Sequence, residues 1–316
     1  MRLPPPARLM FLVFRGLAIS LAFGLLGTAA LNWATGSRAA KEFLIAYIGP
    51  FNTLASLGLA LVTALIVART QHLIPEAIEA AFSEDELALT SYGEQKERFN
   101  SLRRNVTFTA ICAAIGFLIF YFCSFPFSGP AEVLMMSAAV AQWALGGYIG
   151  RKLRYAGMML YALFDVNVHR NLFKERELDA INTYVHLIST LAVIFIYVHV
   201  RGYYYAPFRY DRYIGESAQV FLLLPAILAT PVALMFNFFP REVLQTIYDK
   251  SIDVEMRRLQ ATLRNDSITD AEKQLRVMTF SKMWRDEMRY SLKLTLGDLP
   301  ISLAVLVMVL QPLLKR

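Results

Sequence analysis

The sequence predicts an all-α protein: a polytopic transmembrane helical bundle with six spans, a seventh short hydrophobic segment and a cytosolic helical hairpin region. Hydrophobic residues occupy 56% of the 316 positions and the mean hydropathy is +0.42, whereas soluble domains use roughly 45–50% apolar residues. Six apolar runs approach or exceed the length of about 20 residues that a helix needs to cross a ~30 Å hydrocarbon core. Two periodic apolar stripes after the sixth run predict two further helices.

The transmembrane bundle is expected over residues 1–239, with cytosolic helical loops at 69–105 and 151–181. The six predicted spans are 9–31, 43–68, 106–125, 131–150, 184–200 and 218–239. The first run follows two arginines and ends near small residues, as a signal peptide does, but its length favours an uncleaved first helix.

The distribution of lysine and arginine predicts the orientation of these spans. With the N-terminus inside, 24 of these residues fall in cytosolic segments and five fall outside. Cytosolic loops near membrane helices retain positive charge. We therefore expect an integral, multi-pass protein of the bacterial inner (cytoplasmic) membrane, with its N-terminus and residues 240–300 in the cytosol.

Residues 240–300 are predicted to form a cytosolic αα-hairpin, because apolar residues recur every three or four positions in 241–264 and again in 270–295. Thr269 and Glu272 make a capping-box signature that begins the second helix. The apolar stripes must be buried against each other, against the first cytosolic loop or against another subunit. The candidate interface residues on the second stripe are Phe280, Trp284 and Met288.

The C-terminal segment 301–316 is predicted to be a short hydrophobic helix. Its apolar part covers only 14 residues, which is short for a span. A re-entrant, interfacial or buried helix and a short seventh span both stay open.

No catalytic or cofactor motif is found in the sequence. It contains no GxxxxGK[ST], GxGxxG, GxSxG, HExxH or CxxC pattern. Cys112 and Cys123 are 11 residues apart, about 16 Å along a helix, which is too far for a disulfide. Positive charge is dispersed among acidic residues, which disfavours nucleic-acid binding. We expect a protein that is not an enzyme, with no catalytic residues, no cofactor, no metal and no nucleic-acid partner.

The sixth predicted span contains the candidate pore or hinge residues. Each proline in a helix frees a backbone carbonyl, and in a membrane such carbonyls must face protein or water. A helix with two prolines can also bend, although the prolines could equally serve packing alone. The candidates are Pro225, Thr230, Pro231 and Asn237.

The fourth predicted span contains Gly146 and Gly150 in a GxxxG pattern. Two glycines four residues apart flatten one face of a helix, so that another helix can approach closely. We expect a helix contact there, within the chain or between subunits, with a contact within the chain slightly favoured.

Two classes of function follow from this sequence. The first is an oligomeric channel-like pore or permeability effector, gated by its cytosolic helices. The second is a non-catalytic membrane subunit or scaffold that recruits a soluble partner. A membrane-embedded enzyme or a transporter is less favoured, because the spans carry almost no ionisable residues. The expected partners are the lipid bilayer, further copies of the chain and, in the second class, a cytosolic protein.

The orientation can be tested with a cysteine placed in the hairpin turn. In a variant without Cys112 and Cys123, we expect Ser267→Cys to react with a membrane-impermeant maleimide only after the cells are lysed. Ala206→Cys, in the predicted outer loop, is the control and should react in intact cells. Labelling of Ser267→Cys in intact cells would reverse the orientation.

Overall fold

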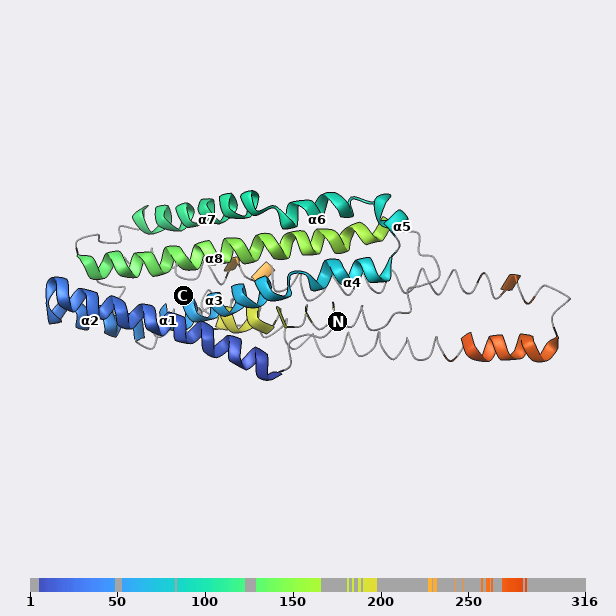
Figure 1. The fold of residues 1–316 in the computed structure, drawn as a ribbon, viewed down its shortest axis with the longest axis horizontal. Coiled ribbons are helices and arrows are strands. Elements are labelled where there is room, and N and C mark those ends of the chain that lie inside the picture. The colour runs from blue at the N-terminus through green and yellow to red at the C-terminus, as the bar shows by residue number, and fades with distance from the viewer. Residues whose placement is uncertain are drawn as a thin grey trace, which may run out of the picture.

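The structure is a computed structural model, and every described element is helical, with no strand among the described residues. It describes residues 6–48, 53–82, 84–122 and 129–165, and beyond these only residues scattered through 181–197, 227–231 and 242–282. The elements are α1 (Pro6–Thr35), α2 (Ser37–Ile48), α3 (Thr53–Thr70), α4 (Leu73–Ala81), α5 (Glu84–Ala88), α6 (Tyr92–Asn100), α7 (Leu102–Phe122), α8 (Pro130–Tyr161) and the 3-10 helix η1 (Ala162–Asp165). The long helices lie along one axis (Figure 1).

Four helical segments are long and apolar enough to cross a membrane: Met10–Thr35, Thr53–Ala80, Leu102–Phe122 and Pro130–Tyr161. Each overlaps one of the first four predicted spans. The fifth and sixth predicted spans, the hairpin and the C-terminal segment lie largely outside the described residues. Within the segment predicted to form the hairpin, residues 270–280 are helical, and this helix begins directly after Thr269, as the capping-box signature predicted.

The second predicted span overlaps two described helices, and residues 49–52 between them lie outside the described residues. α2 ends at Ile48 and α3 begins at Thr53. The sequence between them contains Pro50, which has no N–H to donate and restricts the residue before it.

The helix that contains the fourth predicted span continues beyond residue 150. α8 continues through Arg151, Lys152 and Arg154 to Tyr161, within the segment from residue 151 that the sequence predicts to be a cytosolic helical loop. Charge marked the end of the apolar run, but no glycine or proline interrupts the helix between Arg151 and Ala156. The helix therefore passes from an apolar to a charged environment without a break.

α1, α2 and α3 form the first packed unit. Gly36 has a φ of +88°, a left-handed conformation that glycine adopts without steric cost, and it turns the chain back after α1. α2 and α3 then run antiparallel to α1. Glycines of α1 face their larger side chains: Gly27 lies against Phe43, Gly24 against Tyr47 and Gly16 against Val62.

A buried hydroxyl network joins α1 to both α2 and α3. The Tyr47 hydroxyl lies 3.0 Å from the Ser20 hydroxyl and donates to the Ser20 carbonyl at 3.0 Å. The Ser20 hydroxyl in turn donates to the Leu54 carbonyl at 3.1 Å. Ser20 and Tyr47 are both fully buried. Each of their hydroxyl groups donates a hydrogen bond to a backbone carbonyl, and the two hydroxyl oxygens lie in contact. The network fixes the position at which α2 ends and α3 begins against the middle of α1.

α7 and α8 form the second unit, and again glycine allows close approach. A Cβ at Gly116 of α7 would lie 2.5 Å from Trp143, and a Cβ at Gly147 of α8 would lie 2.6 Å from the Cβ of Cys112. Atoms cannot approach so closely, so a side chain at either position would force the helices apart.

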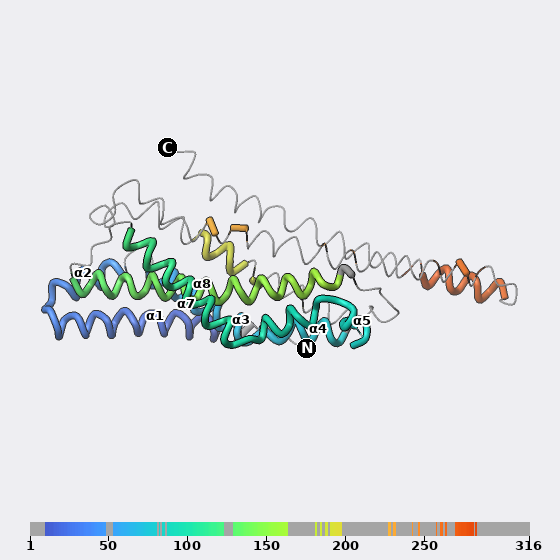
Figure 2. Tube along the Cα trace, turned by 90° about the horizontal axis from the view of Figure 1, so that it is seen from above, coloured from blue at the N-terminus to red at the C-terminus, as the bar shows by residue number. Residues whose placement is uncertain are grey.

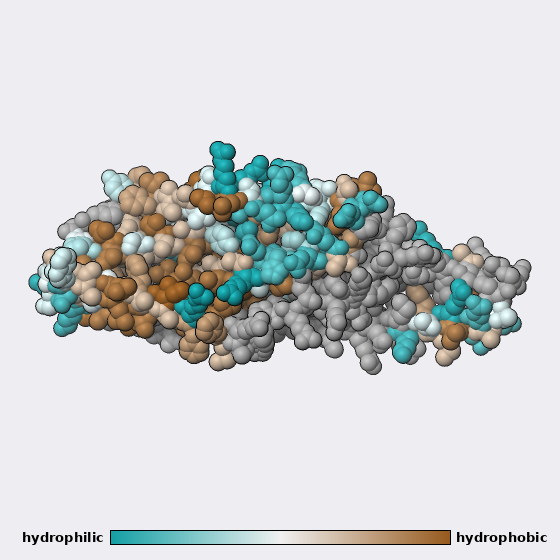
Figure 3. Space-filling view, viewed as in Figure 1, coloured by the Kyte–Doolittle hydropathy of each residue, from teal (hydrophilic) through white to brown (hydrophobic). Residues whose placement is uncertain are grey.

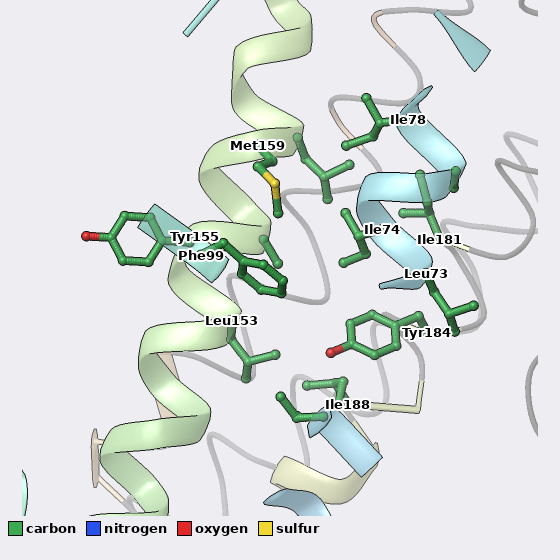
Figure 4. Close-up of a cluster of buried hydrophobic side chains, with 14 of the residues drawn as sticks. Leu73, Ile74, Ile78, Phe99, Leu153, Tyr155, Met159, Ile181, Tyr184 and Ile188 are labelled. Carbon is green, nitrogen blue, oxygen red and sulfur yellow. The ribbon is translucent and has the colours of Figure 1, made fainter. Parts of the chain in front are cut away.

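The main hydrophobic core lies where α4, α6 and the second half of α8 meet. Leu153 and Met159 of α8 point toward Ile74 and Ile78 of α4, with Tyr184 nearby (Figure 4). A smaller core holds α1, α2, α3 and the start of α8 together around Phe43 and Tyr47. Seen from above, α1 and α8 run along the same axis, and α4 and α5 lie beside the end of α8 (Figure 2).

The surface divides into an apolar and a polar part. Hydrophobic side chains cover the outer part of α1, α7 and α8, and hydrophilic side chains gather over α6 and the adjoining end of α7 (Figure 3). α7 is the most exposed of the four candidate spans, with only Asn105 and Gly116 buried. An apolar helix with so little protein cover is typical of contact with lipid.

Gly147→Ala tests the α7–α8 contact. Both Gly147→Ala and the control Gly157→Ala should gain helix propensity of about 1 kcal/mol. Only residue 147 meets Cys112, since no atom of the described residues lies within 4 Å of a Cβ at Gly157. We therefore expect Gly147→Ala to melt at a lower temperature than Gly157→Ala in detergent. Equal melting temperatures would contradict the contact.

Candidate functional site

Two buried cations on α8 define the candidate site. Arg151 is 9% exposed and Lys152 is 5% exposed. Taking a charge out of water costs several kcal/mol unless partners replace the lost hydration. Among the described residues, neither cation forms an ion pair with a carboxylate. Other groups must therefore compensate both charges.

The compensating groups are neutral oxygens at the end of α6 and in the first turn of α7. Arg151 donates from Nε to Asn105 Oδ1 at 2.6 Å and from Nη2 to the Arg98 carbonyl at 3.3 Å. Lys152 donates from Nζ to the Phe99 carbonyl at 2.7 Å, and the Asn105 amide donates to the same oxygen at 3.3 Å. We call this arrangement the α8 clamp: Asn105, Arg151 and Lys152 with the carbonyls of Arg98 and Phe99.

The local sequence explains why these carbonyls are available. α6 ends at Asn100, and Ser101 takes an extended conformation before α7 begins at Leu102. The last carbonyls of a helix have no partner within it and carry the partial negative charge of the helix dipole. Cations placed there are stabilised by both effects. The α8 clamp thus caps α6 and fixes the break between α6 and α7.

Aromatic rings complete the environment of both cations. The Arg151 guanidinium carbon lies 4.8 Å from the centroid of the Tyr155 ring and 5.9 Å from that of Phe108. Lys152 Nζ lies 4.1 Å from the centroid of the Phe99 ring. Such contacts attract a cation to the ring face and are strongest where water is excluded.

α6 is also tied to α4 on another side. The Tyr92 hydroxyl donates to Glu79 Oε1 at 2.9 Å and lies 3.3 Å from the Pro75 carbonyl, and Lys96 forms an ion pair with Glu79. Burial, the hydrogen bond to Glu79 and the charge of Glu79 together raise the pKa of Tyr92. The hydroxyl therefore stays protonated and acts as a donor. α6 is thus bonded to both α4 and α8.

A cavity of about 410 Å³ lies directly next to the α8 clamp. Its walls come from α3, α7, α8 and residues of the fifth and sixth predicted spans, and they are mostly apolar. Arg151 and Arg154 are its cationic lining residues, and Trp143 lies farther along α8. The cavity is therefore amphipathic, with two guanidinium groups and an apolar interior.

Gly146 and Gly150 line this cavity. No atom of the described residues lies within 4 Å of a Cβ at either position. The helix contact that the GxxxG pattern predicts at these two glycines, within the chain or between subunits, therefore stays a prediction. Gly147 faces Cys112 of α7, because one residue along a helix turns the side-chain direction by about 100°.

The other predicted site residues are only partly described. In the sixth predicted span Thr230 is half-buried and Pro231 is exposed, while Pro225 and Asn237 lie outside the described residues. In the segment predicted to form the hairpin, Phe280 is half-buried, and Trp284 and Met288 lie outside the described residues. In the described part of the chain, no group of three or more His, Cys, Asp or Glu residues is placed to hold a metal.

Sequence reasoning missed the α8 clamp because it counted Arg151 and Lys152 as loop charges. A usable signal was present: Arg151 and Lys152 directly follow the apolar run, so a continuing helix places them in the first turn beyond the predicted span. Comparisons of the chain with protein-family models, with curated proteins and with solved structures found no match.

Asn105→Ala tests the α8 clamp. The change leaves the buried Arg151 without its shortest hydrogen bond, so we expect the free energy of unfolding to fall by about 1–3 kcal/mol. Asn100→Ala is the control, because Asn100 is exposed, and it should change stability by no more than about 0.5 kcal/mol. Similar denaturation midpoints for the two variants would show that the clamp contributes little to stability.

Proposed function

We propose that the protein is a multi-pass membrane protein that acts as an oligomeric, channel-like permeability effector gated by its cytosolic helices. The observation that carries this proposal is the α8 clamp, which joins α6 to the candidate span α8 through charge-assisted hydrogen bonds. A gate needs a rigid link between the part that senses and the part that opens. The clamp supplies such a link.

The proposed topology has six spans, the N-terminus in the cytosol and a cytosolic hairpin at residues 240–300, in a bacterial inner membrane. Its support is the charge distribution of the sequence and the hydrophilic surface over α6, beside the apolar surface of α7 (Figure 3). In this orientation α4, α5 and α6 lie on the cytosolic side. The α8 clamp then lies at the inner boundary of the membrane.

The proposed gating movement begins at α6. A shift of α6 acts on α7 through the single residue Ser101 and on α8 through Arg151 and Lys152. Arg151 also lines the cavity, so the same shift changes the space between α7 and α8. An apolar constriction conducts only when it is wide enough to hold water.

The sixth predicted span fits this proposal as the movable wall. Leu228 lines the cavity, and Pro231 follows three residues later. In this proposal Pro225 and Pro231 form the joint of the helix, and Thr230 and Asn237 provide polar groups along the path. The hairpin, which follows the sixth span directly in sequence, would act on this joint.

A membrane scaffold that recruits a soluble partner is the second candidate. The helix at residues 270–280 favours it, because Leu275 and Val277 are 65% and 44% exposed. Apolar side chains so exposed on a cytosolic helix can bind the groove of another protein. Phe280, Trp284 and Met288 would extend this surface.

Ion flux through liposomes distinguishes the two functions. We expect Lys152→Gln, which removes a charged link between α6 and α8, to change the flux through reconstituted protein severalfold. Pro231→Ala should also change it by stiffening the joint. Arg104→Gln, which removes an exposed charge nearby, is the control and should leave the flux unchanged. Folded oligomers that conduct nothing, with or without these changes, would favour the scaffold.

A further inference from the structure

We propose that the cavity beside the α8 clamp binds an anionic membrane phospholipid, with one acyl chain inside the cavity and the phosphate at Arg151 and Arg154. The proposal uses the orientation given above but holds whether or not the protein conducts ions. It rests on the shape of the cavity, on its two guanidinium groups and on their position along α8.

The cavity has the size and lining that an acyl chain requires. Its volume of about 410 Å³ falls within the roughly 300–1,000 Å³ typical of ligand sites. Gly146 and Gly150 leave the α8 wall without side chains. Ile188 and Leu228, from the fifth and sixth predicted spans, contribute apolar groups. An acyl chain can pack against such walls without removing polar groups from water.

The cationic groups select the headgroup. Arg154 is exposed and has neither a hydrogen bond nor a carboxylate partner among the described residues. Arg151 uses Nε and Nη2 in the clamp, and its Nη1 makes no hydrogen bond within the described part of the chain. Guanidinium groups bind phosphate oxygens through paired hydrogen bonds. A zwitterionic headgroup also carries a cation, which two arginines repel.

The position of the arginines fits a lipid of the inner leaflet. Arg151 contacts the end of α6, where the proposed cytosolic segment meets the candidate spans. Phospholipid headgroups lie at this depth, with their chains directed toward the membrane centre. Trp143, two turns nearer the membrane centre along α8, also lines the cavity. Basic pockets between spans on the cytoplasmic side are known to bind anionic headgroups.

Trp143 provides a direct readout of the acyl chain. In a variant with Trp33→Phe and Trp284→Phe, Trp143 is the only tryptophan. This protein is reconstituted into phosphatidylcholine vesicles that contain a small fraction of phosphatidylglycerol or phosphatidylcholine with brominated acyl chains. Bromine quenches tryptophan on contact. We expect phosphatidylglycerol to quench Trp143 at a lower mole fraction than phosphatidylcholine does.

Three further variants assign the binding to this cavity. Arg154→Gln should lower the preference for phosphatidylglycerol about fivefold, whereas Arg104→Gln, an exposed arginine outside the cavity, should leave it unchanged. Gly150→Leu fills the cavity and should reduce quenching by both lipids, with circular dichroism to verify folding.

Several results would overturn the proposal. Equal quenching by the two lipids would mean that the cavity accepts acyl chains without regard to headgroup. Equal losses in Arg104→Gln and Arg154→Gln would indicate general attraction to the surface. An unquenched Trp143 would mean that protein, such as a second copy of the chain, occupies the cavity.

Discussion

The burial of Arg151 and Lys152 is the constraint on which the described structure depends. Both charges are compensated by neutral oxygens and aromatic rings, without a carboxylate among the described residues. This arrangement works only where several carbonyls lack helical partners, which is the case at the end of a helix. α6 must therefore end beside α8, and the chain must turn at Ser101. The position of α6 then determines that of α4 and of the main core.

Close packing of the long helices depends on a second constraint, the placement of glycine. Gly16, Gly24 and Gly27 face large side chains of α2 and α3, and Gly147 faces Cys112. In a membrane the lipid is as apolar as the helices, so contact must come from van der Waals packing and hydrogen bonds. The network of Ser20, Tyr47 and Leu54 supplies the hydrogen bonds. Together these features hold α1, α2 and α3 as one unit.

The clamp and the cavity share one side chain, and this links the two proposals. Arg151 bonds to the end of α6 on one side and lines the cavity on the other. A phosphate bound at Nη1 of Arg151 would partly neutralise the positive charge next to the end of α6. Conversely, a shift of α6 would move the Arg151 guanidinium group. Because such coupling is reciprocal, a lipid that favours one position of α6 is itself bound better in that position.

The sequence by itself determined the helical class and the position of the first four apolar segments, because hydropathy over about 20 residues is a property of the local chain. It also predicted the start of the helix at residue 270 from Thr269 and Glu272. It did not predict the clamp. Asn105 and Arg151 are 46 residues apart, and either could have faced water. Gly146, Gly147 and Gly150 look alike in sequence and all three line the cavity, and only the rotation of α8 against α7 decided that Gly147 is the one that packs against Cys112. The bonding partner of a side chain and the packed face of a helix are decided when helices pack against one another. Only the tertiary structure therefore shows them.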